Sequence, residues 1–199
     1  MSDDEVRTAY AARSAEYTAV LGAVEASPER DRDLIAHWAD RLSGPVVDAG
    51  CGPGHWTAFL HARGVAVEGV DLVPEFVQGA RRRFPEASFR IGSLREPGVA
   101  DGTLGGVLAW YSLIHLPPGD LDDVLAGFAA GLRPGGSLLI GFFEGPLVEQ
   151  FAHAVSPAWF HPLESMRERV ERAGLRVVHQ ERRSSPGVRD HGELIAVRS

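Results

Sequence analysis

Residues 46–57 read Val46-Val47-Asp48-Ala49-Gly50-Cys51-Gly52-Pro53-Gly54-His55-Trp56-Thr57. The apolar start is typical of a short buried strand, and the glycines that follow let the backbone turn sharply and approach a ligand closely. In dinucleotide-binding folds the third glycine comes three places after the second. Here Gly50, Gly52 and Gly54 are each two apart, and an acid, Asp48, stands two residues before the first glycine. The stretch therefore predicts a strand, a ligand-binding turn and a helix, with a spacing that argues against a nicotinamide dinucleotide.

Strands and helices alternate around this stretch. The expected strands are residues 46–48, 65–71, 88–91, 104–111, 137–143, 175–182 and 193–198. The expected helices are residues 3–24, 28–42, 55–63, 74–84, 119–132 and 162–173. Such an alternation predicts an α/β fold with a mainly parallel sheet covered by helices on both faces. The short, turn-rich connection 184–192 predicts that the last two strands are antiparallel.

Two motifs carry a resemblance to a known family. The pattern acid-x-Gly-x-Gly-x-Gly at 48–54 resembles motif I of the class I, Rossmann-like methyltransferases that depend on S-adenosylmethionine (SAM). Residues 132–136, Leu-Arg-Pro-Gly-Gly, resemble the turn before the family's fifth strand. The resemblance extends over about residues 29–199. It implies a three-layer sandwich with a seven-stranded sheet of order 3-2-1-4-5-7-6, the last strand antiparallel, preceded by an N-terminal helical cap. It also implies SAM as cofactor, S-adenosylhomocysteine (SAH) as product, and a likeness to small bacterial enzymes that methylate small molecules.

The resemblance assigns cofactor contacts to residues that follow the first four strands. Asp48 would lie near the methionine ammonium, Asp71 would accept hydrogen bonds from the ribose hydroxyls, and Leu72 would pack on the adenine. Ser93 stands where the family more commonly has an aspartate beside the adenine amino group. The expected cofactor-binding residues are Asp48, Gly50, Cys51, Gly52, Gly54, Asp71, Leu72, Gly92, Ser93, Leu94, Tyr111 and Tyr17.

The whole chain, 1–199, is expected to form one SAM-binding domain, because 199 residues are too few for two ordinary domains. Residues 1–28 would form a lid helix over the cofactor, with Tyr10 and Tyr17 on one face. Residues 144–160 are expected to be irregular, and the segment 144–161 is expected to build the substrate pocket; the alternative is a loop pinned to the core. The candidate pocket side chains are Phe142, Phe143, Phe151, Trp159, His153 and His161.

Two residues near the end of the fourth strand are catalytic candidates. In the family this segment passes beside the reactive methyl, and His115 titrates near neutral pH, so it is a candidate general base. The alternative is a histidine that caps the next helix or shapes the pocket wall. Tyr111 is a candidate for contacting the cofactor or orienting the acceptor, with a core aromatic as the alternative. Methyl transfer mainly needs alignment and exclusion of water, so a base is required only when the nucleophile carries a proton.

Composition argues against some partners and compartments. The net charge of −7 disfavours nucleic acid as a partner, since phosphate binding needs surplus Lys and Arg. Cys51 is the single cysteine, which fits a reducing compartment. The acidic start lacks the features of a signal peptide, and no apolar stretch approaches ~18 residues. A cytoplasmic protein without a membrane partner is expected. The histidines lack metal-ligand spacing, so no metal is predicted, and a homodimer is left open.

The sequence thus predicts a SAM-dependent methyltransferase that acts on an O or N atom of a small-molecule acceptor. Alternatives remain. The chain could bind SAM without catalysis, use SAM for other chemistry, or methylate a peptide or protein. Methylation of nucleic-acid amino groups is disfavoured, because Trp110-Tyr111-Ser112-Leu113 stands where those enzymes have a Pro-Pro-aromatic tetrapeptide.

Overall fold

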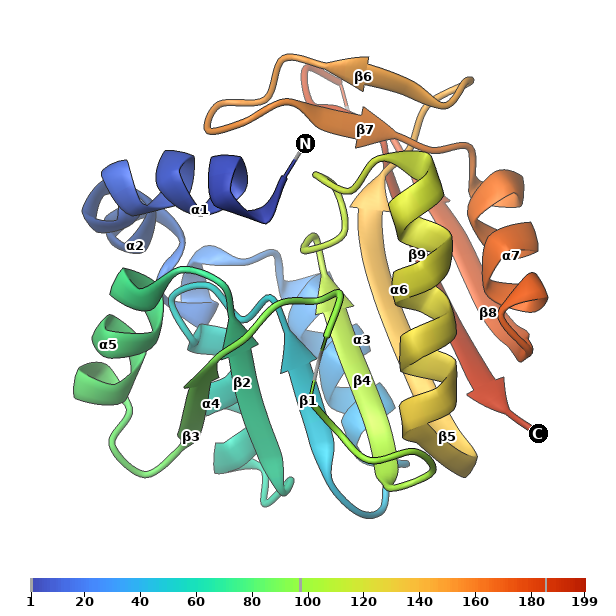
Figure 1. The fold of residues 1–199 in the computed structure, drawn as a ribbon, viewed down its shortest axis with the longest axis horizontal. Helices are drawn as coiled ribbons and strands as arrows, with labels where there is room; N and C mark the ends of the chain where they lie inside the picture. The colour runs from blue at the N-terminus through green and yellow to red at the C-terminus, as the bar shows by residue number, and fades with distance from the viewer. Residues whose placement is uncertain (1, 97, 185) are drawn as a thin grey trace.

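A seven-stranded sheet forms the centre of the protein in the computed structural model, which describes residues 2–96, 98–184 and 186–199. The strands of the sheet are β1 (Val46–Ala49), β2 (Val67–Asp71), β3 (Ser88–Ile91), β4 (Leu104–Trp110), β5 (Leu132–Phe143), β8 (Leu175–Arg183) and β9 (His191–Arg198). Their order is β3-β2-β1-β4-β5-β9-β8 (Figure 1). β9 is antiparallel to β5 and β8, and the other pairs are parallel. The predicted fold class, strand order and antiparallel last strand are confirmed.

Helices cover both faces of this sheet (Figure 1). The helices are α1 (Asp3–Ala12), α2 (Ser14–Leu21), the 3₁₀ turn η1 (Val24–Ala26), α3 (Glu29–Ala39), α4 (His55–Ala62), α5 (Pro74–Arg83), α6 (Pro118–Gly131) and α7 (Leu163–Arg172). Successive strand residues point to opposite faces. In β4, Val107 packs in the cluster that contains α6 and α7, whereas Leu108 packs in the cluster that contains α3 and α4. Because the central strands are buried on both faces, their sequences are almost continuously apolar.

The N-terminal segment is broken into two helices. α1 and α2 are separated at Arg13, where φ is −120° and ψ is 12°, so the predicted single helix over residues 3–24 is wrong. The guanidinium of Arg13 donates a hydrogen bond to the carbonyl of Ala154. This partner lies 141 positions further along the chain. The helical spacing of apolar residues continues through the break, so local sequence gave no sign of it.

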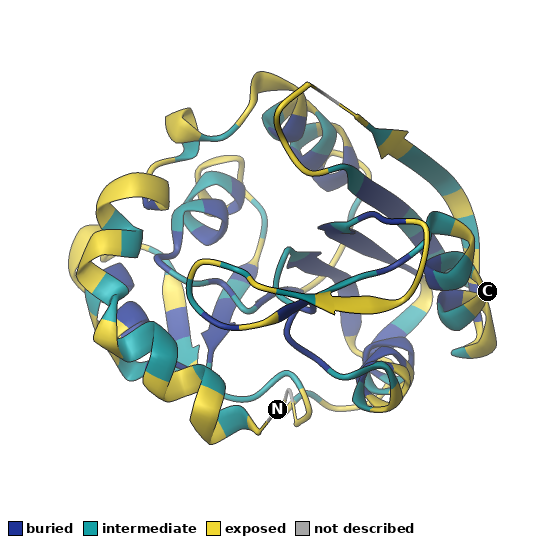
Figure 2. Cartoon of the chain, turned by 90° about the horizontal axis from the view of Figure 1, so that it is seen from above, coloured by how far each residue is buried: buried dark blue, intermediate teal, exposed yellow. Residues whose placement is uncertain are grey.

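The segment predicted to be irregular, 144–160, contains a β-hairpin. Its strands are β6 (Glu149–Phe151) and β7 (Ala158–Phe160), which pair antiparallel. Phe151 and Phe160 stack with ring centroids 4.0 Å apart, which holds the two short strands together. Viewed onto the carboxyl ends of the sheet strands, the hairpin crosses above the buried sheet and α1 and α2 lie beside it (Figure 2). These two elements cover the edge of the sheet where ligands bind in open α/β folds.

The turn predicted at residues 133–136 lies inside β5. The register against β4 shifts from Leu104↔Leu132 to Gly106↔Ser137, which marks a bulge.

No helix in the described residues combines the length and the hydropathy needed to cross a bilayer.

Candidate active site

The glycine-rich loop after β1 owes its shape to three glycines with positive φ. A Cβ on Gly50 (φ +76°) would lie 2.3 Å from the Cβ of Ser112, and a Cβ on Gly54 (φ +86°) would lie 2.7 Å from that of Ala80. Neither site therefore has room for a side chain. Gly52 (φ +52°) is different, because a Cβ there would meet no described atom within 4 Å. The loop thus turns a bare stretch of backbone toward open space.

Asp71, at the end of β2, fixes this loop from the side. Its Oδ2 accepts a hydrogen bond from the backbone N–H of Gly52 at 2.7 Å, and its Oδ1 accepts one from the N–H of Val73 at 2.8 Å. Burial raises the pKa of Asp71 to about 6, against the effect of these hydrogen bonds. A carboxylate offers about four lone-pair sites. Asp71 therefore keeps acceptor capacity for a ligand.

Asp48 lies beneath the loop and is almost fully buried. Its Oδ2 accepts a hydrogen bond from the Thr57 hydroxyl at 2.6 Å. Burial raises the pKa of Asp48 to about 7, so this carboxyl group changes charge near neutral pH. Burial also raises the pKa of the neighbouring Cys51 thiol well above its usual value. A protonated thiol is a poor nucleophile, which argues against covalent chemistry at this cysteine.

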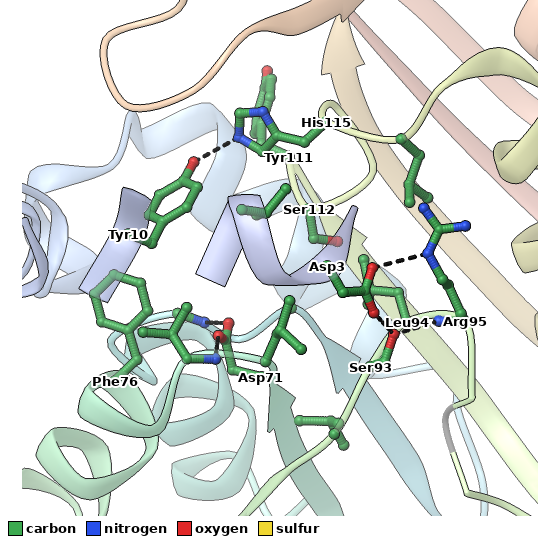
Figure 3. A pocket seen from close by; sticks show the side chains of 18 of the residues that line it. Asp3, Tyr10, Asp71, Phe76, Ser93, Leu94, Arg95, Tyr111, Ser112 and His115 are labelled. Atoms are coloured by element: carbon green, nitrogen blue, oxygen red, sulfur yellow. Dashed lines mark hydrogen bonds and ion pairs between the residues drawn. The ribbon is translucent and has the colours of Figure 1, made fainter. Parts of the chain in front are cut away.

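A first cavity of about 830 Å³ opens between this loop and the N-terminal helices. The predicted cofactor and catalytic residues that line it are Gly50, Gly52, Asp71, Leu72, Gly92, Ser93, Leu94, Tyr111, Tyr17 and His115. Figure 3 shows Asp71 on its floor and Tyr10 and His115 at its rim.

The N-terminal helix α1 closes this cavity from above. Asp3 forms an ion pair with Arg95 at 2.8 Å and accepts a hydrogen bond from the Ser93 hydroxyl at 2.5 Å (Figure 3). The Tyr10 hydroxyl lies 2.7 Å from Nε2 of His115. α1 is therefore fastened near both ends to residues that line the cavity.

The partners of His115 determine which ring nitrogen carries the proton. Its Nδ1 lies 2.8 Å from the carbonyl oxygen of Pro157, which can only accept. Nδ1 is therefore the donor, and Nε2 accepts from Tyr10. Burial lowers the pKa of His115, so the neutral ring is favoured.

A second cavity lies on the other side of Tyr111. It has about 1930 Å³ of space, is open to solvent, and shares Tyr10, Tyr17, Gly50, Gly52, Trp110 and Tyr111 with the first cavity. Asp48 and Cys51 line this second space. Tyr111 has φ +56°, which is an outlier for a bulky residue and is typical of functional sites. Its side chain lines both cavities at the boundary between them.

Residues 46–136 match the family described as Methyltransferase domain. The magnesium-protoporphyrin O-methyltransferase of Rhodobacter capsulatus is 35% identical over 98 residues, which cover 46% of this chain and 43% of that protein. Residues 46–136, somewhat less than half of the chain, are thus similar to the class I SAM-dependent methyltransferases. The alignments cover only 25–55% of the first three curated relatives, so activity and substrate do not follow from this similarity.

Solved structures share the methyltransferase fold over almost the whole chain. The 1,6-didemethyltoxoflavin-N1-methyltransferase of Burkholderia thailandensis, solved with 1,6-didemethyltoxoflavin and SAH, has a TM-score of 0.79 and 22% identity, and the match covers 98% of this chain and 88% of that one. The [4+2]-cyclase SpnF has a TM-score of 0.83 and 16% identity, with 100% and 97% covered. At these identities the likeness shows the fold alone.

Most of the residues predicted from the methyltransferase motifs lie together. Gly54 lines neither cavity among the described residues and instead packs against α5 and β3. Of the six aromatic and histidine side chains predicted for the substrate pocket, Phe143 and His153 line the second cavity. Phe142 and His161 are buried away from it. The hairpin strands make much of this segment a cover over the edge of the sheet, which the sequence did not predict.

Several site residues were not predicted. Asp3 closes the lid, and His191, Arg183 and Asp31 stand together on the far side of the second cavity. One signal was available for His191. Because β9 is antiparallel to β5, its first residue pairs with Phe143 at the carboxyl end of β5, which is the ligand-binding edge of a methyltransferase sheet.

One group within the described parts of the chain has the spacing of metal ligands: His179, Glu181 and Glu193. The guanidinium of Arg30 is bonded to Glu181 and lies 3.9 Å from Glu193. A cation of the protein therefore already neutralises this group, and ion pairing accounts for it.

Proposed function

We propose that this chain is a SAM-dependent methyltransferase that binds SAM in the first cavity and methylates an O or N atom of a small molecule in the second. The observation that carries the proposal is the shared wall. Gly50, Trp110 and Tyr111 line both spaces, so ligands in the two cavities would meet there. Methyl transfer needs such an arrangement, because donor and acceptor atoms must be held in line at contact distance.

The residues around the first cavity fit the parts of SAM. Asp71 keeps free lone pairs for ribose hydroxyls, and Gly52 leaves open backbone beside the methionine part. Leu72 and Leu94 offer apolar contacts for the adenine. Asp48, the proposed negative charge for the ammonium, lines the second cavity beside the shared Gly50 and Gly52. When bound, SAM supplies an electrophilic methyl group on a good leaving group.

Alignment and enclosure would be the chain's own contribution. The Asp3–Arg95 ion pair and the Tyr10–His115 hydrogen bond hold α1 over the first cavity. Closing the site strips water from the nucleophile and from the charged donor. Holding both reactants in a reactive geometry can supply about 7–11 kcal/mol of the barrier. Most of the rate enhancement would come from these two effects.

For an acceptor that carries a proton, His115 is the proposed base. Its Nδ1 holds a proton against the Pro157 carbonyl, so its Nε2 lone pair is the one that can take a proton. While α1 covers the cavity, this lone pair accepts a hydrogen bond from the Tyr10 hydroxyl. A proton from the acceptor would therefore reach His115 through the Tyr10 hydroxyl or after this hydroxyl has moved aside.

Two other functions remain candidates. The fold of the [4+2]-cyclase SpnF extends over the whole chain, so a reaction other than methyl transfer is the second candidate. Methylation of a peptide or protein is the third candidate.

Two measurements test this proposal. Isothermal titration should detect SAH binding, and failure at millimolar SAH would remove the cofactor assignment. Incubation with SAM and pooled small molecules should release SAH and yield one product heavier by a single CH₂. A product of unchanged mass formed without SAH release would favour the cyclase-like alternative.

Assembly and location complete the proposal. We expect a cytoplasmic protein from the single buried cysteine and the acidic composition. A homodimer would be recognised by light scattering after size-exclusion chromatography, and cell fractionation would test the location.

A further inference from the structure

The far wall of the second cavity holds a chain of hydrogen bonds that ends on His191. The Tyr111 hydroxyl lies 2.6 Å from Nδ1 of His191, and Nη2 of Arg183 lies 3.4 Å from the same hydroxyl oxygen. Arg183 is in turn held by Asp31 at 2.5 Å and by Glu193 at 3.0 Å. Tyr111, His191, Arg183 and Asp31 all line the cavity.

This chain fixes the tautomer of His191. A guanidinium can only donate, so the Tyr111 oxygen accepts from Arg183 and its own hydrogen is free to bond to Nδ1. Burial, followed by the nearby Arg183 charge, lowers the pKa of His191 and favours the neutral ring. A neutral ring that accepts at Nδ1 carries its proton on Nε2. No described residue accepts a hydrogen bond from this Nε2–H group. The group can therefore donate a hydrogen bond to a ligand.

The arginines around the second cavity are already paired. Three arginines line the cavity, and five carboxylates surround them. Arg30 pairs with Glu181 and Glu193, Arg182 pairs with Glu144 and Asp190, and Arg183 pairs with Asp31 and Glu193. Carboxylates therefore outnumber guanidiniums. A ligand with a free carboxylate or phosphate would meet no unpaired guanidinium among the described lining residues, and would add like charge to a group that is negative in sum.

Aromatic rings form the rest of the wall near His191. The Phe143 ring centroid lies 5.4 Å from that of Tyr111, 5.6 Å from that of His191 and 5.9 Å from that of His153. Arg189 is not a lining residue, and its guanidinium lies 4.8 Å above the Phe151 ring and 6.0 Å above the Phe143 ring. Ring-lined walls of this kind favour flat apolar ligands that stack or pack edge to face.

From this geometry we infer that the second cavity takes an uncharged, flat aromatic acceptor, and that Nε2–H of His191 donates a hydrogen bond to an oxygen on that acceptor. His191 is thus a positioning residue for the acceptor, and Tyr111 with Arg183 keeps its proton on the correct nitrogen. The inference rests on the proposed function, in which SAM fills the first cavity and leaves the second to the acceptor. It adds to that function a substrate class and a residue that distinguishes among substrates.

The tautomer can be tested without a substrate. Long-range ¹H–¹⁵N NMR of the histidine rings in SAH-bound protein should show His191 protonated at Nε2 and His115 protonated at Nδ1. Tyr111→Phe removes the donor to Nδ1, and the His191 signals should shift toward a mixture of tautomers while those of His115 stay. A His191 ring protonated at Nδ1 in the wild type would overturn the inference.

Three matched probes test the ligand class: 2-acetylnaphthalene, 2-ethylnaphthalene and 2-naphthoate. They share one flat ring system and differ in an uncharged oxygen, no oxygen, and a charge. In SAH-saturated protein the acetyl compound should bind roughly three- to tenfold more tightly than the ethyl compound, the value of one neutral hydrogen bond. The carboxylate should bind most weakly.

Variants tie this preference to His191. His191→Phe should abolish the preference for the acetyl compound, and His191→Gln, which keeps an N–H donor, should restore part of it. His37→Phe, at an exposed position on α3, is the matched control and should behave as wild type. Tightest binding of 2-naphthoate, or an undiminished acetyl preference in His191→Phe, refutes the inference. Absence of SAH binding in the wild type would instead refute the proposed function, since SAH is measured first.

Discussion

Replacing Asp71 by alanine should separate its ligand role from its structural role. In the ligand-free protein the variant leaves the N–H groups of Gly52 and Val73 without this acceptor, at about 1–3 kcal/mol each when buried. It also removes a carboxylate whose burial raises its pKa from 3.8 to about 6. Above pH 6 this rise corresponds to ~3 kcal/mol of destabilisation. The two effects oppose each other, so the free energy of unfolding should change by no more than a few kcal/mol.

The ligand-bound state offers no such compensation. Hydrogen bonds from the ribose hydroxyls to a charged acceptor contribute about 1.5–3 kcal/mol, so Asp71→Ala should weaken SAH binding by roughly tenfold to a hundredfold. Isothermal titration at pH 8 measures the affinity, and urea unfolding without ligand measures the stability. Asp101→Asn, an exposed acid beyond the cavity, serves as control and should change neither.

The amide variant sharpens the test. Asp71→Asn keeps one oxygen acceptor but turns an NH₂ donor toward the other backbone N–H, so it should be less stable than wild type and should still bind SAH weakly. Wild-type SAH affinity in both variants, with near-UV circular dichroism unchanged, would refute the ribose assignment and leave Asp71 as a residue that only shapes the loop.

Further expectations concern pH, the loop and the base. Because burial raises the pKa of Asp48 to about 7 and of Asp71 to about 6, both groups lose their protons between pH 5.5 and 8, and SAH affinity should rise roughly tenfold across this window in titrations at constant ionic strength. Gly50→Ala should lower the melting temperature clearly more than Gly64→Ala, since both have positive φ but only the first would clash; equal effects would show that the loop has room. His115→Asn should reduce turnover ~10²–10⁴-fold with loss of the pH dependence that His115 causes. Because His115 lines the first cavity and bonds to Tyr10 of α1, SAH affinity should fall as well, but far less than turnover. A retained pH profile with weaker acceptor binding would show that His115 only shapes the wall.

Local patterns in the sequence were sufficient for the sheet and for one side of the site. The apolar run of β1, the spacing of Gly50, Gly52 and Gly54, and the acid that ends β2 are short-range features, and each depends on backbone geometry within a few residues. The resemblance then supplied the strand order, which periodicity alone could not. The lining of the first cavity was predictable because the carboxyl ends of successive parallel strands meet at one edge.

The far wall of the second cavity depends on contacts between distant residues, and the sequence analysis missed most of it. Asp31 and Arg183 are 152 positions apart, and Tyr111 and His191 are 80 apart. The break at Arg13 likewise involves a partner in the hairpin. Charged and aromatic residues of these kinds are common on solvated surfaces, so their types alone did not indicate that folding gathers them around one cavity.

Tyr111 connects the two halves of the site, and its backbone explains why. A bulky residue at positive φ costs of order 1–3 kcal/mol, a strain that persists only where the surroundings hold it. Here the phenol hydroxyl is held between His191 and Arg183, and the ring packs against Phe143. The strained turn thus directs the end of β4 toward β9, and the same ring forms part of the first cavity. A cofactor bound beside Tyr111 and an acceptor positioned by His191 would therefore be aligned through one side chain, which neither ligand could displace without breaking the contacts that hold the strain.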